Sequence, residues 1–72
     1  MTLEQIKKKI RYGDYSTLGL MLAINPDAAK MRFLRNDSLA IQAMTIIITH
    51  REEMISKFHQ MFSQDLKQHH SD

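Results

Sequence analysis

Cysteine and tryptophan are absent from this chain of 72 residues, proline occurs once and glycine twice. Without cysteine the chain has no disulfide, no thiolate ligand for zinc and no cysteine nucleophile, and a reducing compartment suits it. Few prolines and glycines mean few positions at which a helix must end. We therefore expect long helical segments in a cytoplasmic protein.

A long apolar run is also missing. The longest apolar stretch, residues 39–48, is interrupted by Gln42 and Thr45 and falls far short of the roughly 20 residues that span a bilayer. The first ten residues, MTLEQIKKKI, contain no apolar segment of the kind found in secretion signals. The sequence therefore predicts a soluble protein with no membrane partner.

Charge is spread unevenly, although the net formal charge is only +2. Residues 1–36 contain seven lysines and arginines against three acidic residues, whereas residues 37–72 contain three against five. A basic half joined to a mildly acidic half indicates a surface that faces a polyanion.

Apolar residues recur at helical spacing along most of the chain, and alternating runs of β-branched residues are absent. The pattern predicts an all-α fold of four helices with a central helix-turn-helix and a long C-terminal helix. Residues 1–62 are expected to form one domain, and residues 63–72 a polar tail that frays. The helices are expected over residues 2–12, ended by Gly13; from a cap at Asp14 or Ser16 to about residue 23; over 26–35, between Asn25 and Asn36-Asp37; and from Ser38 onward for some 25 residues or more.

The second and third of these segments read YSTLGLMLAINPDAAKMRFLR, residues 15–35. Two short amphipathic helices joined by three or four residues are typical of a helix-turn-helix. Gly19 allows the following helix to cross closely, and Ala23-Ile24 form the turn. Ala29 and Phe33, four residues apart, are expected to face the core. On the preceding helix Tyr15, Leu18, Met21 and Leu22 are expected to point inward.

Residues 24–35, INPDAAKMRFLR, resemble the recognition-helix stretch of sigma-factor-like helix-turn-helix domains, in which an apolar residue, a polar cap and an acidic residue precede a basic segment ending in Arg-x-x-Arg. Residues 6–55 also resemble a group of small helix-turn-helix proteins of Bacteroidetes and their mobile elements, through a basic first helix leading into Gly-Asp-Tyr and a last helix with Ile-Ile-x-x-Arg-Glu. The resemblance implies DNA binding by a small regulator or accessory factor, without enzymatic activity or cofactor. The chain departs from the pattern at Ala23, where the turn usually has glycine, and at Asp27 and Ala28, whose side chains offer guanine no hydrogen-bond donor.

A helix-turn-helix assigns the outward residues to duplex DNA. We expect Lys30 and Arg32 in the major groove, with Asp27, Ala28 and Met31 beside them. Asp27 could accept from a cytosine amino group, and Ala28 or Met31 could contact a thymine methyl. The helix ends and the remaining basic residues are expected to contact phosphates. These phosphate-contacting residues are Asn25, Ser16, Thr17, Arg35, Lys7, Lys8 and Arg11.

The predicted last helix is apolar on more than one face in its first half. Ala40, Met44 and Ile47 lie close to one face, which Met54, Phe58 and Met61 continue, with Arg51 in between. Apolar residues outside that face need a second cover, and in so short a chain a second copy is the expected source. The expected homodimer interface consists of Leu39, Ile41, Ile46, Ile48, Ile55 and Phe62.

Catalysis is not expected. No serine has a histidine and an acid at recognisable spacing, no glycine-rich phosphate loop is present, and a small-molecule substrate would find little room for a cleft. His50 and His59 lack the i, i+4 spacing of a helical metal pair, and the adjacent His69 and His70 fall short of the four ligands of a structural site, so no metal is expected. The alternative to DNA binding is a helical protein-interaction module that docks a partner through the last helix. RNA binding is a third possibility, although no aromatic stacking platform is evident.

Overall fold

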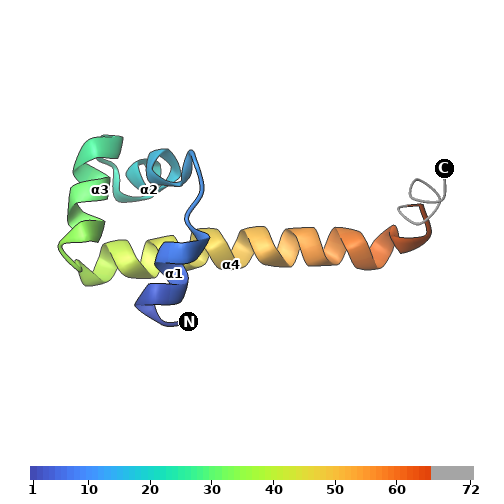
Figure 1. Cartoon of the computed structure of the whole chain (residues 1–72). Coiled ribbons are helices and arrows are strands. Elements are labelled where there is room, and N and C mark those ends of the chain that lie inside the picture. Colours follow the sequence, from blue (N-terminus) through green and yellow to red (C-terminus); the bar gives the residue numbers. More distant parts are fainter. Residues whose placement is uncertain (66–72) are drawn as a thin grey trace.

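The computed structural model describes residues 1–65, which form four α-helices followed by a single helical turn at 63–65 (Figure 1). The helices are α1 (Leu3–Lys9), α2 (Asp14–Leu22), α3 (Pro26–Leu34) and α4 (Ser38–Met61). No β-strand occurs within residues 1–65, and the all-α prediction with a long last helix is confirmed. Most of the tail predicted to fray, from residue 66 onward, lies outside the described residues.

Side-chain caps fix the starts of three helices where the sequence places them. Thr2 and Gln5 form a reciprocal capping box at α1, with Thr2 N donating to Gln5 Oε1 at 2.8 Å. Asn25 Oδ1 accepts from Ala28 N at 2.8 Å at the start of α3, where Pro26 occupies the first helical position. Asp37 Oδ2 accepts from Ala40 N at 3.0 Å at the start of α4. Each cap satisfies a backbone N–H that has no partner inside its helix.

The first helix is shorter than expected. It ends at Lys9, Ile10 is extended, and Gly13 with φ +93° precedes α2 instead of terminating α1. One tertiary and one local hydrogen bond account for the early end. Arg51 Nη2 donates to the Lys9 carbonyl from across the fold, and Asp14 Oδ2 accepts from Arg11 N three residues away, both at 2.7 Å. These bonds satisfy backbone groups that a longer helix would have used.

Helices α2 and α3 lie on one side of the N-terminal half of α4, α1 crosses that half, and the C-terminal half of α4 projects beyond them (Figure 1). We call residues 3–51 the head. Its core contains Ala29 and Phe33, which confirms the predicted inward pair, whereas Met21 is largely exposed, contrary to expectation. The buried apolar residues are Ile6, Leu18, Ala29, Phe33, Ala40, Ala43, Met44 and Ile48.

A close backbone approach sets the angle between α2 and α3. A Cβ built on Gly19 would lie 2.7 Å from the carbonyl oxygen of Ile24, so no larger residue fits without moving the turn. The turn itself passes through Ala23 in the left-handed region, with φ 59°, a conformation that costs a residue with a Cβ about 1 kcal/mol. Glycine at position 19 therefore lets the two short helices pack tightly.

The structure corrects part of the expected dimer interface. Ile48 is fully buried in the head of a single chain, and Ile41 packs against the same core. Both residues share the face of α4 that α1, α2 and α3 cover, because Ile48 lies one turn after Met44. Leu39, Ile46, Ile55 and Phe62 are exposed, as a surface available to a second chain requires. Among the described residues no helix is long and apolar enough to cross a membrane.

Candidate nucleic-acid interface

The outward face of α3 carries five of the twelve residues that the sequence assigned to DNA. Because Ala29 and Phe33 are fully buried, the opposite face turns to solvent and exposes Asp27, Met31 and Arg35. Lys30 is also exposed, and Ala28 is half-buried at the edge of this face. A helix held from behind by two buried side chains presents its free face as a rigid surface.

Arg32 differs from its expected role. Its Nη2 atom donates to Asp37 Oδ2 at 3.1 Å, and the same Asp37 oxygen caps α4. The side chain is half-buried and directed toward the junction of α3 and α4, away from the outward face. Arg32 therefore links α3 to the start of α4 and is not free for base contacts. It is next to the buried Phe33 in the sequence, so its side chain leaves α3 near the buried face rather than from the outward face.

Lys30 lies beside α2 rather than projecting straight out from α3. Its Nζ atom lies 5.6 Å from the centre of the Tyr15 ring, within the range of a cation–π contact. The Tyr15 ring in turn meets Phe33 edge-on, with ring centroids 6.1 Å apart. Burial raises the pKa of the Tyr15 phenol and the Asp14 carboxylate raises it further, so the hydroxyl stays neutral near pH 7. Lys30 is thus held at a defined position on a neutral aromatic ring.

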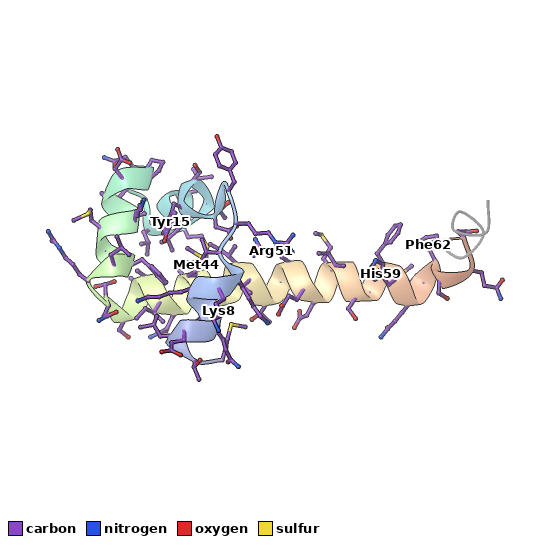
Figure 2. All side chains as sticks on the ribbon, viewed as in Figure 1. Lys8, Tyr15, Met44, Arg51, His59 and Phe62 are labelled. Atoms are coloured by element: carbon purple, nitrogen blue, oxygen red, sulfur yellow. The ribbon has the colours of Figure 1, made fainter. Side chains whose placement is uncertain are left out.

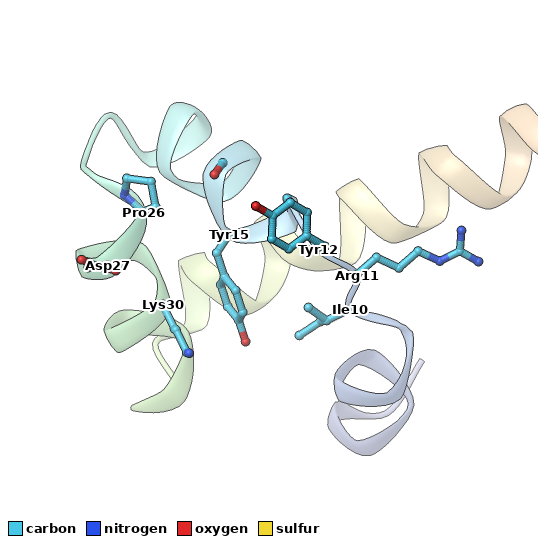
Figure 3. Close-up of a pocket in the computed structure, with 9 residues that line it drawn as sticks. Ile10, Arg11, Tyr12, Tyr15, Pro26, Asp27 and Lys30 are labelled. Carbon is cyan, nitrogen blue, oxygen red and sulfur yellow. The ribbon is translucent and has the colours of Figure 1, made fainter.

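A groove of about 570 Å³ separates the start of α2 from the start of α3 (Figure 3). Its lining includes Arg11, Ser16, Asp27 and Lys30, four residues that the sequence assigned to DNA from three separate segments. In Figure 3 the Arg11 guanidinium points away from α3, so only part of this residue faces the groove. The other lining residues are Ile10, Tyr12, Gly13, Tyr15 and Pro26.

Sequence reasoning did not single out Tyr12 and Tyr15 as part of this groove. Tyr12 is fully exposed at its rim, and Tyr15 forms one wall (Figure 3). Tyr12 was expected to close the first helix, and its role depends on the early end of α1 at Lys9. No local signal in the sequence placed the two tyrosines there, because the groove forms only where the chain before α2 packs beside α3.

The remaining polar residues of the predicted site are only partly free. Asn25 uses its Oδ1 atom for the α3 cap, which leaves its NH2 group for a phosphate. Thr17 Oγ1 donates to the Gly13 carbonyl at 3.3 Å, whereas Ser16 is exposed in the groove. These three residues flank the N-terminal ends of α2 and α3, where backbone N–H groups favour an anion.

The basic residues of α1 do not join the groove. Lys9 Nζ lies 2.7 Å from Glu52 Oε2, and Lys8 lines a separate hollow with Lys9, Arg51 and Glu52. Figure 2 shows Lys8 and Tyr15 on opposite sides of the α4 ribbon. Lys7 and Lys8 are exposed, and neither lines the groove beside α3.

The groove and the outward face of α3 contain donors and acceptors for a polyanion but no constellation of ligands for a metal. Within residues 1–65 no three histidines, cysteines or acidic residues converge on one point. Comparison with protein-family models, with curated proteins and with solved structures finds no match to the chain. Its function must therefore be inferred from the geometry of these residues.

Proposed function

We propose that this protein binds duplex DNA by placing α3 in the major groove, as a small transcriptional regulator or an accessory factor of a mobile element. The observation that carries the proposal is the geometry of α2 and α3: two short helices meet at Gly19 through a three-residue turn, and the second is anchored in the core by Ala29 and Phe33. The exposed face of such a helix fits a major groove about 12 Å wide.

The residues of α3 support contacts with the DNA backbone more strongly than base reading. Lys30 and Arg35 supply positive charge, and Asp27, Ala28 and Met31 are the other residues at or near the outward face of α3. Asp27 can accept from a cytosine amino group, and Ala28 and Met31 can contact a thymine methyl. With Arg32 bound to Asp37, we expect affinity to come mainly from phosphate contacts and to fall steeply with salt.

The groove beside α3 and the helix ends next to it supply the phosphate contacts in this proposal. Ser16, Thr17 and the NH2 group of Asn25 lie at the ends of α2 and α3, and Tyr12 extends from the rim. A tyrosine hydroxyl and a serine hydroxyl both donate to phosphate oxygens. A strand of the duplex that passes over this rim would meet Tyr12 and Arg11 before reaching Lys30.

Fluorescence anisotropy with a labelled duplex of random sequence tests the proposal. The wild-type chain is titrated at about 50 mM and 200 mM salt beside Lys30→Ala, Arg35→Ala and, as a control of equal charge change, Lys57→Ala on the far half of α4. A plot of the logarithm of the binding constant against the logarithm of the salt concentration has a slope set by the number of phosphate contacts. Each α3 variant should reduce the magnitude of that slope by about 0.9, the value for one phosphate contact, and weaken binding about fivefold to tenfold. Lys57→Ala should bind like wild type.

Two outcomes would reject DNA binding. One is an absence of binding by the wild type at low salt, and the other is binding that does not change with salt. The alternative function, a helical module that docks a protein partner, is favoured by the exposed apolar residues Met54, Ile55, Phe58, Met61 and Phe62 on α4. That alternative predicts partner binding that depends on these apolar residues and does not change when Lys30 or Arg35 is replaced.

A further inference from the structure

The part of α4 beyond the head carries an apolar stripe that nothing else within residues 1–65 covers. Phe58 and Phe62 form a tilted aromatic pair with ring centroids 4.8 Å apart, and a hollow of about 310 Å³ lies beside Phe58 between Met54, Ile55 and His59. We call the stripe the α4 stripe. It consists of Met54, Ile55, Phe58, Met61 and Phe62, which are 66%, 38%, 52%, 67% and 40% exposed.

We propose that the α4 stripe pairs with the same stripe of a second copy of this chain, with the two helices antiparallel. The spacing of the stripe is symmetric about Phe58. Ile55 and Met61 lie three residues before and after it, and Met54 and Phe62 lie four residues before and after it. Antiparallel pairing about Phe58 sets Met54 opposite Phe62 of the second copy and Ile55 opposite its Met61. Phe58 then meets its own counterpart, as a two-fold interface requires.

The position of the head decides between antiparallel and parallel pairing. Met44, Ile48 and Arg51 lie in one row at intervals of four and three residues, and Ile55, Phe58 and Phe62 continue the same row. The head therefore covers the very face of α4 that becomes the α4 stripe after residue 51. Parallel partners would place both heads between two helices only about 8–10 Å apart, whereas antiparallel partners place them at opposite ends.

The size of the α4 stripe fits a second copy of itself. Five large side chains with about half of each exposed offer on the order of 500 Å² per chain, so pairing would bury about 1,000 Å² in total. That value reaches the lower bound for a specific interface and predicts a reversible dimer. Lys57 and His59 lie at the edges of the stripe, about 100° from its centre on either side, so no charge is buried by the pairing.

Measurement of molar mass by sedimentation equilibrium tests the pairing on the full chain. The wild type should form a dimer at micromolar concentrations, and Phe58→Glu should raise the dimer dissociation constant at least tenfold because the two charges meet at the two-fold axis. Leu20→Glu, a change at another exposed apolar residue on α2, is the control and should dimerise like wild type. Circular dichroism should show both variants folded, since both positions are exposed.

Spin labels test the direction of the pairing, because a chain without cysteine takes a single label at one introduced site. Gln42→Cys and Gln60→Cys place labels on the same side of α4, sixteen and two residues from Phe58. With a rise of 1.5 Å per residue, antiparallel pairing predicts a distance of about 50 Å for Gln42→Cys and about 25 Å for Gln60→Cys. A parallel dimer predicts short distances at both sites.

The proposal is overturned by a wild type that stays monomeric at high micromolar concentration, by a dimer that survives Phe58→Glu, or by a short distance at Gln42→Cys. A monomer that exposes the α4 stripe would point to a different protein as its partner. The pairing does not depend on DNA binding, since Lys30→Ala and Arg35→Ala leave the α4 stripe intact. Failure of either proposal is therefore distinguishable from failure of the other.

Discussion

Arg51 on α4 reaches back to Asp14 at the start of α2, where its Nη1 atom lies 2.7 Å from Asp14 Oδ1. Its Nη2 atom donates to the Lys9 carbonyl at the end of α1. The other Asp14 oxygen accepts from Arg11 N, so the carboxylate is bonded on both oxygens although the residue is almost fully buried. One guanidinium thus joins three helices at the point where α4 leaves the head.

Arg51→Met should destabilise the fold by about 3 kcal/mol, because it leaves the buried Asp14 carboxylate without its counter-charge. The methionine keeps the length and apolar volume of the side chain, so the loss reports the missing ion pair rather than a cavity. Urea denaturation followed by circular dichroism measures the change. The matched control is Lys9→Met, which removes an ion pair with Glu52 whose two side chains are nearly half exposed and should cost less than about 1 kcal/mol. Equal losses for both variants would contradict a special role for Arg51.

Gly19→Ala should destabilise by about 2 kcal/mol, within the range for overpacked sites. The added methyl group would lie 2.7 Å from the Ile24 carbonyl oxygen and 3.3 Å from two further backbone atoms of the turn, none of which can move as a side chain does. Alanine is a better helix former than glycine, so a purely local account predicts the opposite sign. Thermal and urea unfolding measure the sign of the stability change, with Leu20→Ala at an exposed position of the same helix as the control. A Gly19→Ala variant more stable than the wild type would contradict the prediction.

Ala23→Gly should stabilise the fold by about 0.5–1 kcal/mol. Ala23 has φ 59°, a left-handed conformation that glycine adopts without steric cost. Its backbone N–H bonds to the Gly19 carbonyl as part of the helix end, and this bond survives the change. The gain is reduced by the larger entropy of glycine in the unfolded chain. An unfolding midpoint in urea below that of the wild type would show that the turn is not strained at this position.

Asp27→Asn should strengthen DNA binding about threefold to tenfold under the proposed function. Asp27 is exposed in the first turn of α3 and lines the groove, so its carboxylate repels phosphates there. The variant should lose a few tenths of a kcal/mol of stability, because an acidic side chain favours a helix N-terminus. Anisotropy at two salt concentrations measures the first effect and urea denaturation the second. Weaker binding by Asp27→Asn would instead indicate that the carboxylate accepts from a base.

Alkaline pH should destabilise the wild type more than Tyr15→Phe. Burial, followed by the Asp14 carboxylate, raises the pKa of Tyr15 in the folded chain above its ordinary value of 10.0. The unfolded chain therefore ionises Tyr15 first, so the contribution of the neutral phenol is complete below pH 10 and is lost as pH rises through the folded pKa. Phenylalanine retains the ring that meets Phe33 and Lys30. Urea midpoints at pH 8 and pH 11 measure the difference, and equal shifts in the two proteins would refute it.

Local signals in the sequence placed most of the helix ends correctly. Asn25 with Pro26 and Asp37 with Ser38 set the starts of α3 and α4, because a cap needs only a side chain and a backbone N–H three residues away. Ala29 and Phe33 were predicted to face inward for a comparable reason, since residues four apart share a helix face. Patterns of this kind are contained within a few consecutive residues.

Contacts between distant residues decided the rest. The sequence predicted that Arg32 enters the major groove of DNA, but Arg32 is bound to Asp37. It predicted that Ile48 lies in a dimer interface, but Ile48 is buried in the head. Likewise, the end of α1 at Lys9 depends on Arg51, which lies 42 residues further along the chain. The sequence by itself determined which segments are helical and which residues anchor α3. Only the tertiary structure determined which face of α4 the head covers, and hence that the α4 stripe beyond Arg51 is exposed, because that coverage depends on how separate helices pack.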